Sequence, residues 1–295
     1  MALETTIVPK PPYSLALSAR MKSDATRFFR DGVLTMVFEV DGAPALARVY
    51  QRSDGSLAVR IEASGRTAAL EKVRFILAAD DSHTPFLLRF ARDPLIGAAT
   101  RALAGLRPLR TATVTHALLK AVCGQLIQAK AARLLENRLV RKASSEHAGL
   151  RLPPERNTFS RFTRAELARD GLVSRKASAL LRLTHDFDPE RLHSVETATA
   201  ARRIERERGL GPWSAGMVCL HGLGRYEHGL EGDLGLIKLC AALHGRPADV
   251  EDTQELLEPY GEWAGLASVF LLASFPKNPR GRPKARRNIA FSYGS

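Results

Sequence analysis

The stretch AARRIERERGLGPWSAGMVCLHGLG, residues 200–224, ends one helical pattern and starts another. A first helix is predicted to end at Arg208, and Gly209-Leu210-Gly211 then predicts a tight turn before Pro212 opens a second helix. Two glycines two positions apart can adopt positive φ, and the unpaired N–H groups of a helix start suit a phosphate. The stretch therefore predicts a phosphate-binding hairpin, although an αα-hairpin without a ligand has the same pattern.

A candidate catalytic carboxylate follows this hairpin. After a loop at residues 225–232, the next helix is predicted to begin with the segment DLGLIK at 233–238. Asp233 is expected to cap this helix, because aspartate is a favoured N-cap residue, and to face the mouth of the hairpin. A carboxylate in that place is also a candidate for catalysis. Capping and catalysis are compatible, so the spacing alone leaves both roles open.

The charge of the chain points to a polyanionic partner. The formal net charge is +13 and the pI is near 10.1, and lysines and arginines that neutralise phosphates release condensed counterions. A basic surface that serves only solubility would give the same balance. The apolar fraction of 45% and the charged fraction of 25% are those of a globular protein.

Several kinds of site are excluded by the residue types. Three widely spaced cysteines, Cys123, Cys219 and Cys240, cannot supply a four-cysteine iron–sulfur cluster and are expected to be buried free thiols. The eight histidines form no HExxH or comparable cluster, and no GxxxxGKS/T motif occurs. We therefore expect no metal site made of side chains and no nucleotide-binding phosphate loop.

The period of the hydrophobic pattern predicts an α+β fold that is mainly α-helical. Segments 34–40, 45–51 and 57–64 are rich in β-branched or aromatic residues and are separated by turn signals, so they predict a small antiparallel sheet. Residues 67–77 predict an amphipathic helix on this sheet. From Asp93 onward the pattern is helical, and the predicted helices cover residues 94–104, 113–128, 129–142, 163–170, 174–185, 195–207, 212–222, 233–243, 252–258 and 262–274.

Three parts follow from these patterns: an N-terminal α/β unit at residues 1–92, a helical body at 93–275 and a basic tail at 276–295. The tail has no acidic residue and contains three prolines, which disfavours a packed helix. Its segment Arg280-Gly281-Arg282-Pro283 resembles the AT-hook, in which two arginines lie along the minor groove. A basic arm that makes non-specific phosphate contacts is the alternative.

The segments GLGPWSAGMVCLHGLG and GDLGLIK together resemble the helix-hairpin-helix DNA glycosylase superfamily, and within it the bacterial 3-methyladenine DNA glycosylase II group. The resemblance covers most of the chain. Residues 91–110 and 116–140 are similar to the start of the helical domain, 166–187 to its middle helices and 259–275 to its closing helix. The N-terminal unit fits the accessory domain of that group in size and place.

The resemblance implies a chemical role for two residues. Such enzymes flip a damaged nucleotide out of the duplex and cut its N-glycosidic bond. Asp233 takes the position of the carboxylate that stabilises the oxocarbenium-like transition state and orients the attacking water. Trp213 stands where strand-cleaving members carry a nucleophilic lysine, so no lyase step is expected. Its ring would stack on a cationic alkylated purine or pack in the core.

Other residues are implied in DNA contact. Gly209, Leu210, Gly211 and Ser214 would hold a phosphate through backbone N–H groups. In related proteins a monovalent cation on the hairpin carbonyls supports this contact, and it is the one cofactor that the resemblance suggests. Gln125-Leu126 matches the place where the family inserts a side chain into the gap left by the flipped base, although Leu126 also fits a core leucine.

The base pocket departs from that of the group. Met217 stands where a tyrosine is expected and Leu272 where a tryptophan is expected, so the pocket that they form with Trp213 is less aromatic. Preference for cationic alkylpurines rests partly on aromatic lining, and the choice of lesion therefore stays open.

The sequence thus predicts a monofunctional DNA glycosylase of base excision repair that releases alkylated purines such as 3-methyladenine. The alternatives are a glycosylase for a deaminated or oxidised base, and a non-catalytic DNA-binding protein on the same scaffold. We expect a monomer that acts on double-stranded DNA. No apolar run is long enough to cross a membrane, and we expect a cytoplasmic protein associated with a bacterial nucleoid.

Overall fold

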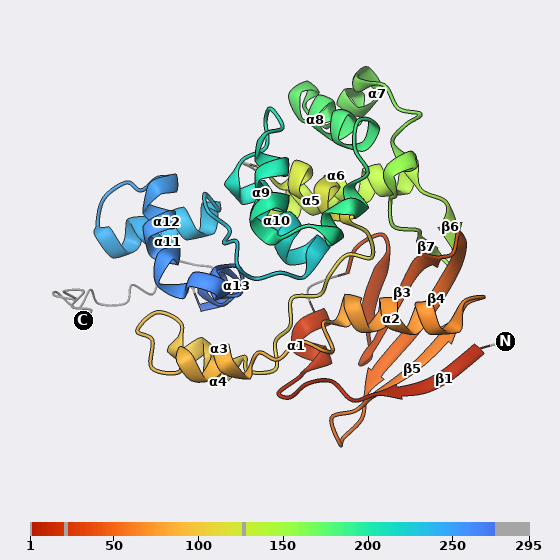
Figure 1. The fold of residues 1–295 in the computed structure, drawn as a ribbon, viewed down its shortest axis with the longest axis horizontal. Coiled ribbons are helices and arrows are strands. Elements are labelled where there is room, and N and C mark those ends of the chain that lie inside the picture. Colours follow the sequence, from red (N-terminus) through yellow and green to blue (C-terminus); the bar gives the residue numbers. More distant parts are fainter. Residues whose placement is uncertain (1, 21–22, 126–127, 275–295) are drawn as a thin grey trace.

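The computed structural model describes residues 2–20, 23–125 and 128–274 of the chain. Within them, an antiparallel sheet unit lies beside a larger helical region (Figure 1). This is the α+β class that the sequence predicts. None of the helices in these ranges combines the length and the apolar character that crossing a bilayer requires.

The N-terminal unit is a five-stranded antiparallel sheet in the order β1-β5-β4-β3-β2. Its strands are β1 (Ala2–Ile7), β2 (Arg27–Arg30), β3 (Val33–Val40), β4 (Ala43–Gln51) and β5 (Leu57–Glu62). The turns at Asp31-Gly32 and Asp41-Gly42 have positive φ at both residues, as two-residue hairpins with strongly twisted strands require. Helix α2 (Arg66–Leu77) packs on the sheet as predicted, and α1 (Leu15–Ala19) adds to the same core.

The sequence pattern predicted the three inner strands but missed both outer ones. In β1 only Ile7 is buried, while the five preceding side chains are exposed or half-buried. β1 therefore lacks the hydrophobic alternation by which a half-buried strand is recognised. β2 has only four residues. Both strands lie at the edges of the sheet and depend on pairing with β5 and β3.

The helical region follows the predicted 3.6-residue period, apart from the unpredicted short helix α3. Its α-helices are α3 (Thr84–Arg89), α4 (Gly97–Ala102), α5 (Val114–Gly124), α6 (Ala129–Ala143), α7 (Arg164–Arg169), α8 (Ser174–His185), α9 (Thr197–Glu205), α10 (Pro212–Val218), α11 (Leu234–His244), α12 (Val250–Leu257) and α13 (Ala264–Ser274). The connections contain β6 (Glu146–His147), β7 (Leu150–Arg151) and the 3-10 segments η1 (Arg156–Thr158), η2 (Pro189–Ser194) and η4 (Glu258–Trp263).

The second helix of the hairpin changes its winding where the sequence predicted a regular helix. After Val218, α10 continues as a π-helical turn, η3 (Cys219–Leu223), that ends at Gly224. The carbonyl of His221 in this turn accepts from the N–H and the hydroxyl of Thr111 at 2.8 and 3.0 Å. The linker that leaves the sheet unit is therefore fixed to the hairpin helix at the π-helical turn.

The helical region has two cores, and one of them takes in a segment from before residue 93. The first core is built from α5 to α10, and the second from α3, α4, η3 and α11 to α13. Phe86 of α3 and Phe90, which follows the helix, lie in the second core, where the ring of Phe86 is 5.1 Å from that of Phe270. Residues 84–92, grouped by the sequence with the sheet unit, thus pack with the helical region. A six-residue helix is too short for its period to show which core it joins.

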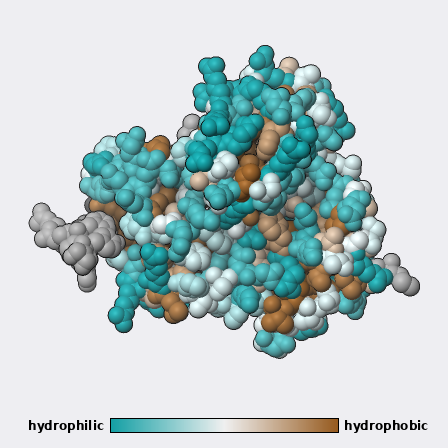
Figure 2. All heavy atoms as spheres, in the orientation of Figure 1, coloured by the Kyte–Doolittle hydropathy of each residue, from teal (hydrophilic) through white to brown (hydrophobic). Residues whose placement is uncertain are grey.

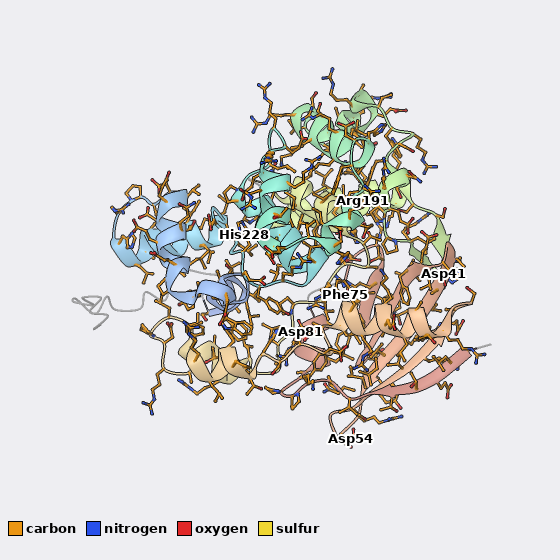
Figure 3. All side chains as sticks on the ribbon, in the orientation of Figure 1. Asp41, Asp54, Phe75, Asp81, Arg191 and His228 are labelled. Carbon is orange, nitrogen blue, oxygen red and sulfur yellow. The ribbon has the colours of Figure 1, made fainter. Side chains whose placement is uncertain are left out.

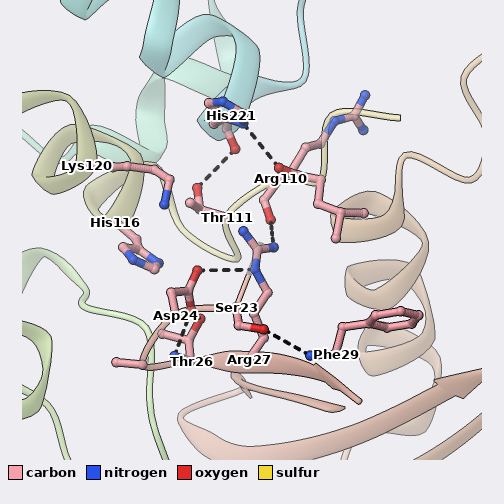
Figure 4. A network of polar contacts seen from close by, with 12 residues as sticks. Ser23, Asp24, Thr26, Arg27, Phe29, Arg110, Thr111, His116, Lys120 and His221 are labelled. Atoms are coloured by element: carbon pink, nitrogen blue, oxygen red, sulfur yellow. Dashed lines mark hydrogen bonds and ion pairs between the residues drawn. The ribbon is translucent and has the colours of Figure 1, made fainter. Parts of the chain in front are cut away.

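A buried charge network lies where the sheet unit meets the helical region, and Figure 4 shows Asp24 and Arg27 of this network near His116 and Lys120. On the sheet side, the Nε of Arg27 lies 3.3 Å from the Oδ2 of Asp24, and both side chains are nearly fully buried. On the helical side, Glu136 of α6 is 3% exposed, and its Oε1 lies 2.9 Å from both His116 Nε2 and Lys120 Nζ of α5. The network places charges of both signs at the boundary between the two regions.

A second junction lies where α2 ends. Arg110 pairs with Asp81, donates to the Gly224 carbonyl at 3.1 Å and lies over the ring of Phe75, 4.7 Å from its centroid. The hydroxyl of Tyr226 also donates to Asp81. Figure 3 shows Phe75 and Asp81 at this boundary between α2 and the helical region. The loop that leads from η3 to α11 is therefore held against the sheet unit.

Candidate active site

The predicted turn lies between α9 and α10. Gly209 has a φ of +100°, which L side chains rarely adopt, and Leu210 is buried. Gly211 does not have the positive φ expected of it: its φ is −132°, in the extended range, because it serves as the N-cap of α10. Pro212 follows at the first helical position, as predicted.

The backbone N–H groups of this turn fall into two sets. The N–H of Leu210 donates to Glu207 and that of Ser214 to Gly211, each at 2.9 Å, so both are already used inside the hairpin. The N–H groups of Gly209 and Gly211 have no acceptor in the part of the chain that the structure describes. A Cβ on Gly211 would meet nothing within 4 Å, so space is open beside it. Of the four residues expected to bind phosphate, the two glycines keep free donors.

Asp233 caps α11 and lies beside the hairpin. Its Oδ1 accepts from the N–H groups of Gly235 and Leu236 at 2.7 and 3.4 Å, which is the N-cap geometry that the sequence predicts. Its Oδ2 accepts from the indole Nε1 of Trp213 at 3.0 Å. Three N–H donors therefore fix the orientation of a carboxylate that is only half-buried.

Trp213 connects the hairpin with this carboxylate. A Cβ built on Gly124, at the end of α5, would lie 2.6 Å from the Cη2 of Trp213, so the ring packs directly on the backbone there. The indole thus reaches from Gly124 to Asp233. The sequence indicated stacking on a base or core packing for this ring, and it gave no signal for the hydrogen bond. In the structure Trp213 packs against the second helical core while staying half-buried.

The close contact at Gly124 gives a testable prediction. Gly124→Ala should push the indole away from its position, lower the free energy of unfolding by about 1–3 kcal/mol and shift the tryptophan emission. The measurement is chemical denaturation together with the emission spectrum. The chain has two tryptophans, so the control is Gly124→Ala made in the Trp213→Phe variant. There the substitution should no longer shift the emission. An unchanged spectrum in Gly124→Ala alone would contradict the packing described here.

The other two residues predicted for the base pocket come from α10 and α13. Met217 and Leu272 are half-buried, and both pack against the second helical core, as Trp213 does. A Cβ on Gly235 would lie 2.5 Å from the Cδ2 of Leu272 and 3.0 Å from the Oδ1 of Asp233. Leu272 therefore covers the first turn of α11 next to the carboxylate, and glycine at position 235 makes this approach possible.

The residues predicted to enter the DNA are only partly within the described chain. The side-chain amide of Gln125 donates to the Gly209 carbonyl and to the Ser214 hydroxyl, both at 2.8 Å, so it is bound to the hairpin in this structure. Leu126, Arg280 and Arg282 lie outside the described residues. Insertion of Leu126 and minor-groove contact by the tail therefore stay predictions.

Glu231 is the other carboxylate near Asp233 in sequence, and it faces a different part of the molecule. Its Oε2 accepts from Gln254 of α12 at 2.9 Å. It lines an open hollow of about 530 Å³ whose other walls come from the loop before α11, from α12 and from η4. Neither Asp233 nor Trp213 lines that hollow, so Glu231 is poorly placed to replace Asp233.

A positively charged side chain lies next to the turn of the hairpin. Arg175, in the first turn of α8, is exposed, and its Nε would lie 3.3 Å from a Cβ on Gly209. No pattern along the chain singles out Arg175, because the two residues are 34 positions apart and only the fold brings them together. Figure 2 shows a mostly hydrophilic surface over the lobe formed by α6 to α9. Its exposed basic residues include Lys130, Arg133, Arg138, Arg141, Arg202, Arg206 and Arg208.

The described residues offer no metal cluster of side chains. No group of three or more His, Cys, Asp or Glu within residues 2–20, 23–125 and 128–274 is arranged to hold an ion. The three cysteines are free and buried, as the sequence predicts. A cation on hairpin carbonyls would use backbone oxygens, and it stays a prediction.

The chain is similar along most of its length to known DNA glycosylases. No protein-family profile matches it. The DNA-3-methyladenine glycosylase of Bacillus subtilis is 23% identical over 278 residues, which cover 88% of this chain and 91% of that protein. The structure of a 3-methyladenine DNA glycosylase from Archaeoglobus fulgidus matches with a TM-score of 0.78 at 20% identity, over 92% of this chain and 97% of that one.

A second kind of glycosylase shares the architecture. The 8-oxoguanine glycosylase/lyase of Clostridium acetobutylicum, solved in complex with double-stranded DNA that contains 8-oxoguanine, matches with a TM-score of 0.71 at 16% identity, over 88% of this chain and 90% of that one. The fold is therefore that of the helix-hairpin-helix DNA glycosylases. Among proteins of this fold, the chain is similar to 3-methyladenine DNA glycosylases in sequence and in structure.

Proposed function

We propose that this protein is a monofunctional DNA glycosylase of base excision repair that hydrolyses the N-glycosidic bond of alkylated purines such as 3-methyladenine. The observation that carries the proposal is the contact between Trp213, at the start of the second hairpin helix, and Asp233, at the start of the next helix. A phosphate-binding turn and a fixed carboxylate thus lie at one place. The full-length similarity to a DNA-3-methyladenine glycosylase supports the same conclusion.

The DNA phosphate is held by the glycines of the turn. The free N–H groups of Gly209 and Gly211 lie near the start of α10, where the helix dipole favours an anion. Arg175 adds a positive charge beside Gly209. The basic lobe of α6 to α9 extends this surface, and we propose that it faces the backbone of double-stranded DNA bound by one copy of the protein.

Asp233 acts on the flipped nucleotide. Cleavage of the N-glycosidic bond leaves positive charge on the deoxyribose, and a negative charge fixed nearby stabilises the transition state without having to reorient. The bonds from Gly235, Leu236 and Trp213 hold the carboxylate in one orientation. The partly exposed carboxylate also accepts a hydrogen bond from the attacking water and takes its proton as the bond breaks.

The nucleophile is water because the hairpin offers no amine. The residue two positions after Gly211 is Trp213, whose indole N–H is a donor with no nucleophilic lone pair. Lys176, the lysine that contacts the neighbouring end of α5, donates its Nζ to the Gln125 carbonyl at 2.7 Å. A Schiff base would require this amine to leave that bond. Strand cleavage is therefore not part of the proposed reaction.

The pocket residues leave room for a second substrate class. Trp213 supplies one aromatic surface, while Met217 and Leu272 supply aliphatic ones. A cationic purine gains most from aromatic faces, whereas a neutral oxidised or deaminated base needs shape and hydrogen bonds more than charge recognition. The fold shared with an 8-oxoguanine glycosylase/lyase makes a neutral lesion the second candidate.

The test is base release from defined duplexes. Duplex DNA treated with a methylating agent, and duplexes with one 8-oxoguanine, hypoxanthine or uracil, are incubated with the protein, and released bases are separated by chromatography. We expect 3-methyladenine from methylated DNA, no strand break at the resulting abasic site and no covalent complex after borohydride reduction. A covalent complex would contradict the monofunctional mechanism. Release of only a neutral base would replace the alkylpurine assignment, and release of none would contradict the enzyme proposal.

A further inference from the structure

Gln125 connects three elements that are far apart in sequence. It follows the last residue of α5, and its side-chain Nε2 donates to the Gly209 carbonyl and to the Ser214 hydroxyl, both at 2.8 Å. Its own carbonyl accepts from Lys176 of α8 at 2.7 Å. The end of α5 is therefore held by α8 on one side and by the hairpin on the other.

The contacts of Gln125 with Lys176 and with Ser214 come from equivalent places in two similar turns. The segments GLVSRKA at 171–177 and GLGPWSA at 209–215 share Gly-Leu at their start and Ala at their end. Gly171 and Gly209 have φ values of +102° and +100°. Lys176 and Ser214 are each the third residue of the helix that follows. Gln125 thus lies between two hairpins of the same design and is contacted by the same helical position of both.

The contact with Gly209 fixes the middle of the phosphate-binding turn. In the peptide unit between Gly209 and Leu210, the carbonyl accepts from Gln125, and the N–H donates to Glu207 at 2.9 Å. Both ends of this planar unit are therefore held. The N–H groups of the flanking units, those of Gly209 and Gly211, are the ones left without an acceptor in the described residues.

We propose that Gln125 is a positioning residue for the phosphate-binding turn, and that it does not enter the DNA. The inference rests on the DNA binding proposed above, and it replaces the sequence-based expectation that Gln125 contacts DNA beside the flipped base. To insert into the duplex, the side chain would have to give up two hydrogen bonds of good length. In its present place it sets the orientation of the turn that grips a phosphate.

The test is Gln125→Met, which keeps the length of the side chain, removes both donors and leaves the net charge unchanged. Dissociation constants are measured over a salt series for two duplexes, one undamaged and one with a tetrahydrofuran abasic-site analogue. We expect the affinity for both to fall by the same factor, about tenfold. The slope of log K against log salt should stay unchanged, because the N–H groups of the turn are neutral and no lysine or arginine that displaces counterions is lost.

A second variant separates this role from a general loss of stability. Ser214→Ala removes one of the two groups that accept from the Gln125 amide. The effects of the two substitutions therefore overlap, and the double variant should weaken binding by clearly less than the product of their separate effects. A general loss of stability would lower the melting temperature but would leave the dissociation constant of the folded protein, measured well below that temperature, unchanged.

The other outcomes overturn the proposal. If Gln125→Met loses only its preference for the abasic analogue, the side chain acts in the gap left by the base. Unchanged affinity for both duplexes would mean that the turn does not need Gln125. Wild-type protein that binds neither duplex would mean that there is no phosphate contact for Gln125 to position. The binding assay does not depend on base release. A protein that binds DNA but releases no base would therefore contradict the proposed glycosylase activity and leave the proposed role of Gln125 intact.

Discussion

Asp233→Asn should abolish base release while DNA binding survives. The substitution removes the negative charge that we propose stabilises the oxocarbenium-like transition state, and losing one preorganised electrostatic group typically costs a factor of about 10²–10³ in rate. We expect at least that loss in the single-turnover rate of 3-methyladenine release. The dissociation constant for the abasic-analogue duplex should change little, because the glycines that we propose bind phosphate are untouched. Single-turnover kinetics and a binding titration measure the two effects.

The geometry of Asp233 determines which controls are needed. Asparagine keeps a carbonyl oxygen that can cap α11, and it is as good an N-cap as aspartate. Its amide group, however, would stand opposite the indole N–H of Trp213, which now donates to Oδ2 at 3.0 Å. Two donors facing each other would displace the ring. The double variant Asp233→Asn with Trp213→Phe removes this conflict and isolates the effect of the charge.

The two variants therefore give a clear decision about Asp233. If both lose base release to the same extent, the carboxylate charge is responsible. If the double variant recovers most of the activity, the displaced indole caused the defect and Asp233 is a cap only. Trp213→Phe alone keeps the charge and the aromatic surface, so it should retain far more activity than either.

The sequence predicted the parts of the site that depend on local chain geometry. Gly209 and Pro212 mark the turn because positive φ and a fixed helix start are properties of single residues. Asp233 was found because an N-cap has a characteristic residue type and place. By contrast, the indole of Trp213 reaches across 20 positions to Asp233, and Gln125 reaches across 84 to Gly209. Such contacts depend on how the helices pack, and no pattern along the chain records them.

The same distinction applies to the fold. The inner strands and the long helices have buried faces of regular period, whereas β1 gains its structure only from pairing with β5. The π-helical turn at η3 was also missed, because its residues read as an ordinary continuation of α10. The His221 carbonyl in this turn accepts from Thr111, which lies 110 positions earlier in the chain.

The largest loss of stability is expected from Glu136→Gln, at the junction between the sheet unit and the helices. Glu136 is 3% exposed and its Oε1 lies 2.9 Å from Lys120 Nζ and from His116 Nε2. Removing one member of a buried ion pair leaves the other charge without its partner, which typically costs about 3–5 kcal/mol. We expect about 3 kcal/mol, because Lys120 is 20% exposed and regains some hydration. Urea denaturation measures the change.

Matched controls distinguish the buried pair from an ordinary surface charge. Glu62→Gln makes the same chemical change in a pair with Arg48 in which both side chains are nearly half exposed, and it should cost less than about 1 kcal/mol. Lys120→Met combined with Glu136→Gln removes both charges, so it should be less destabilising than Glu136→Gln alone. A loss as small as that of Glu62→Gln would contradict a structural role for the network.

The network also predicts how stability depends on pH. Burial by itself would raise the pKa of Asp24, but the charges of Arg27, Lys120 and His116 outweigh it and hold the pKa well below its usual range. Burial would also raise the pKa of Glu136, but the charge of Lys120 and the hydrogen bond from His116 outweigh this effect. The pKa of Glu136 is therefore lowered as well. Carboxyls with a lower pKa in the folded state stabilise it at pH values above about 4, where the unfolded groups ionise. The stabilisation is lost as the pH falls below that value, because protonation then favours the unfolded chain.

Wild-type stability should therefore decline steeply from pH 4 downward, and Glu136→Gln should be less stable at pH 7 but show a shallower decline. Equal slopes for the two proteins would mean that Glu136 is not held ionised by its neighbours.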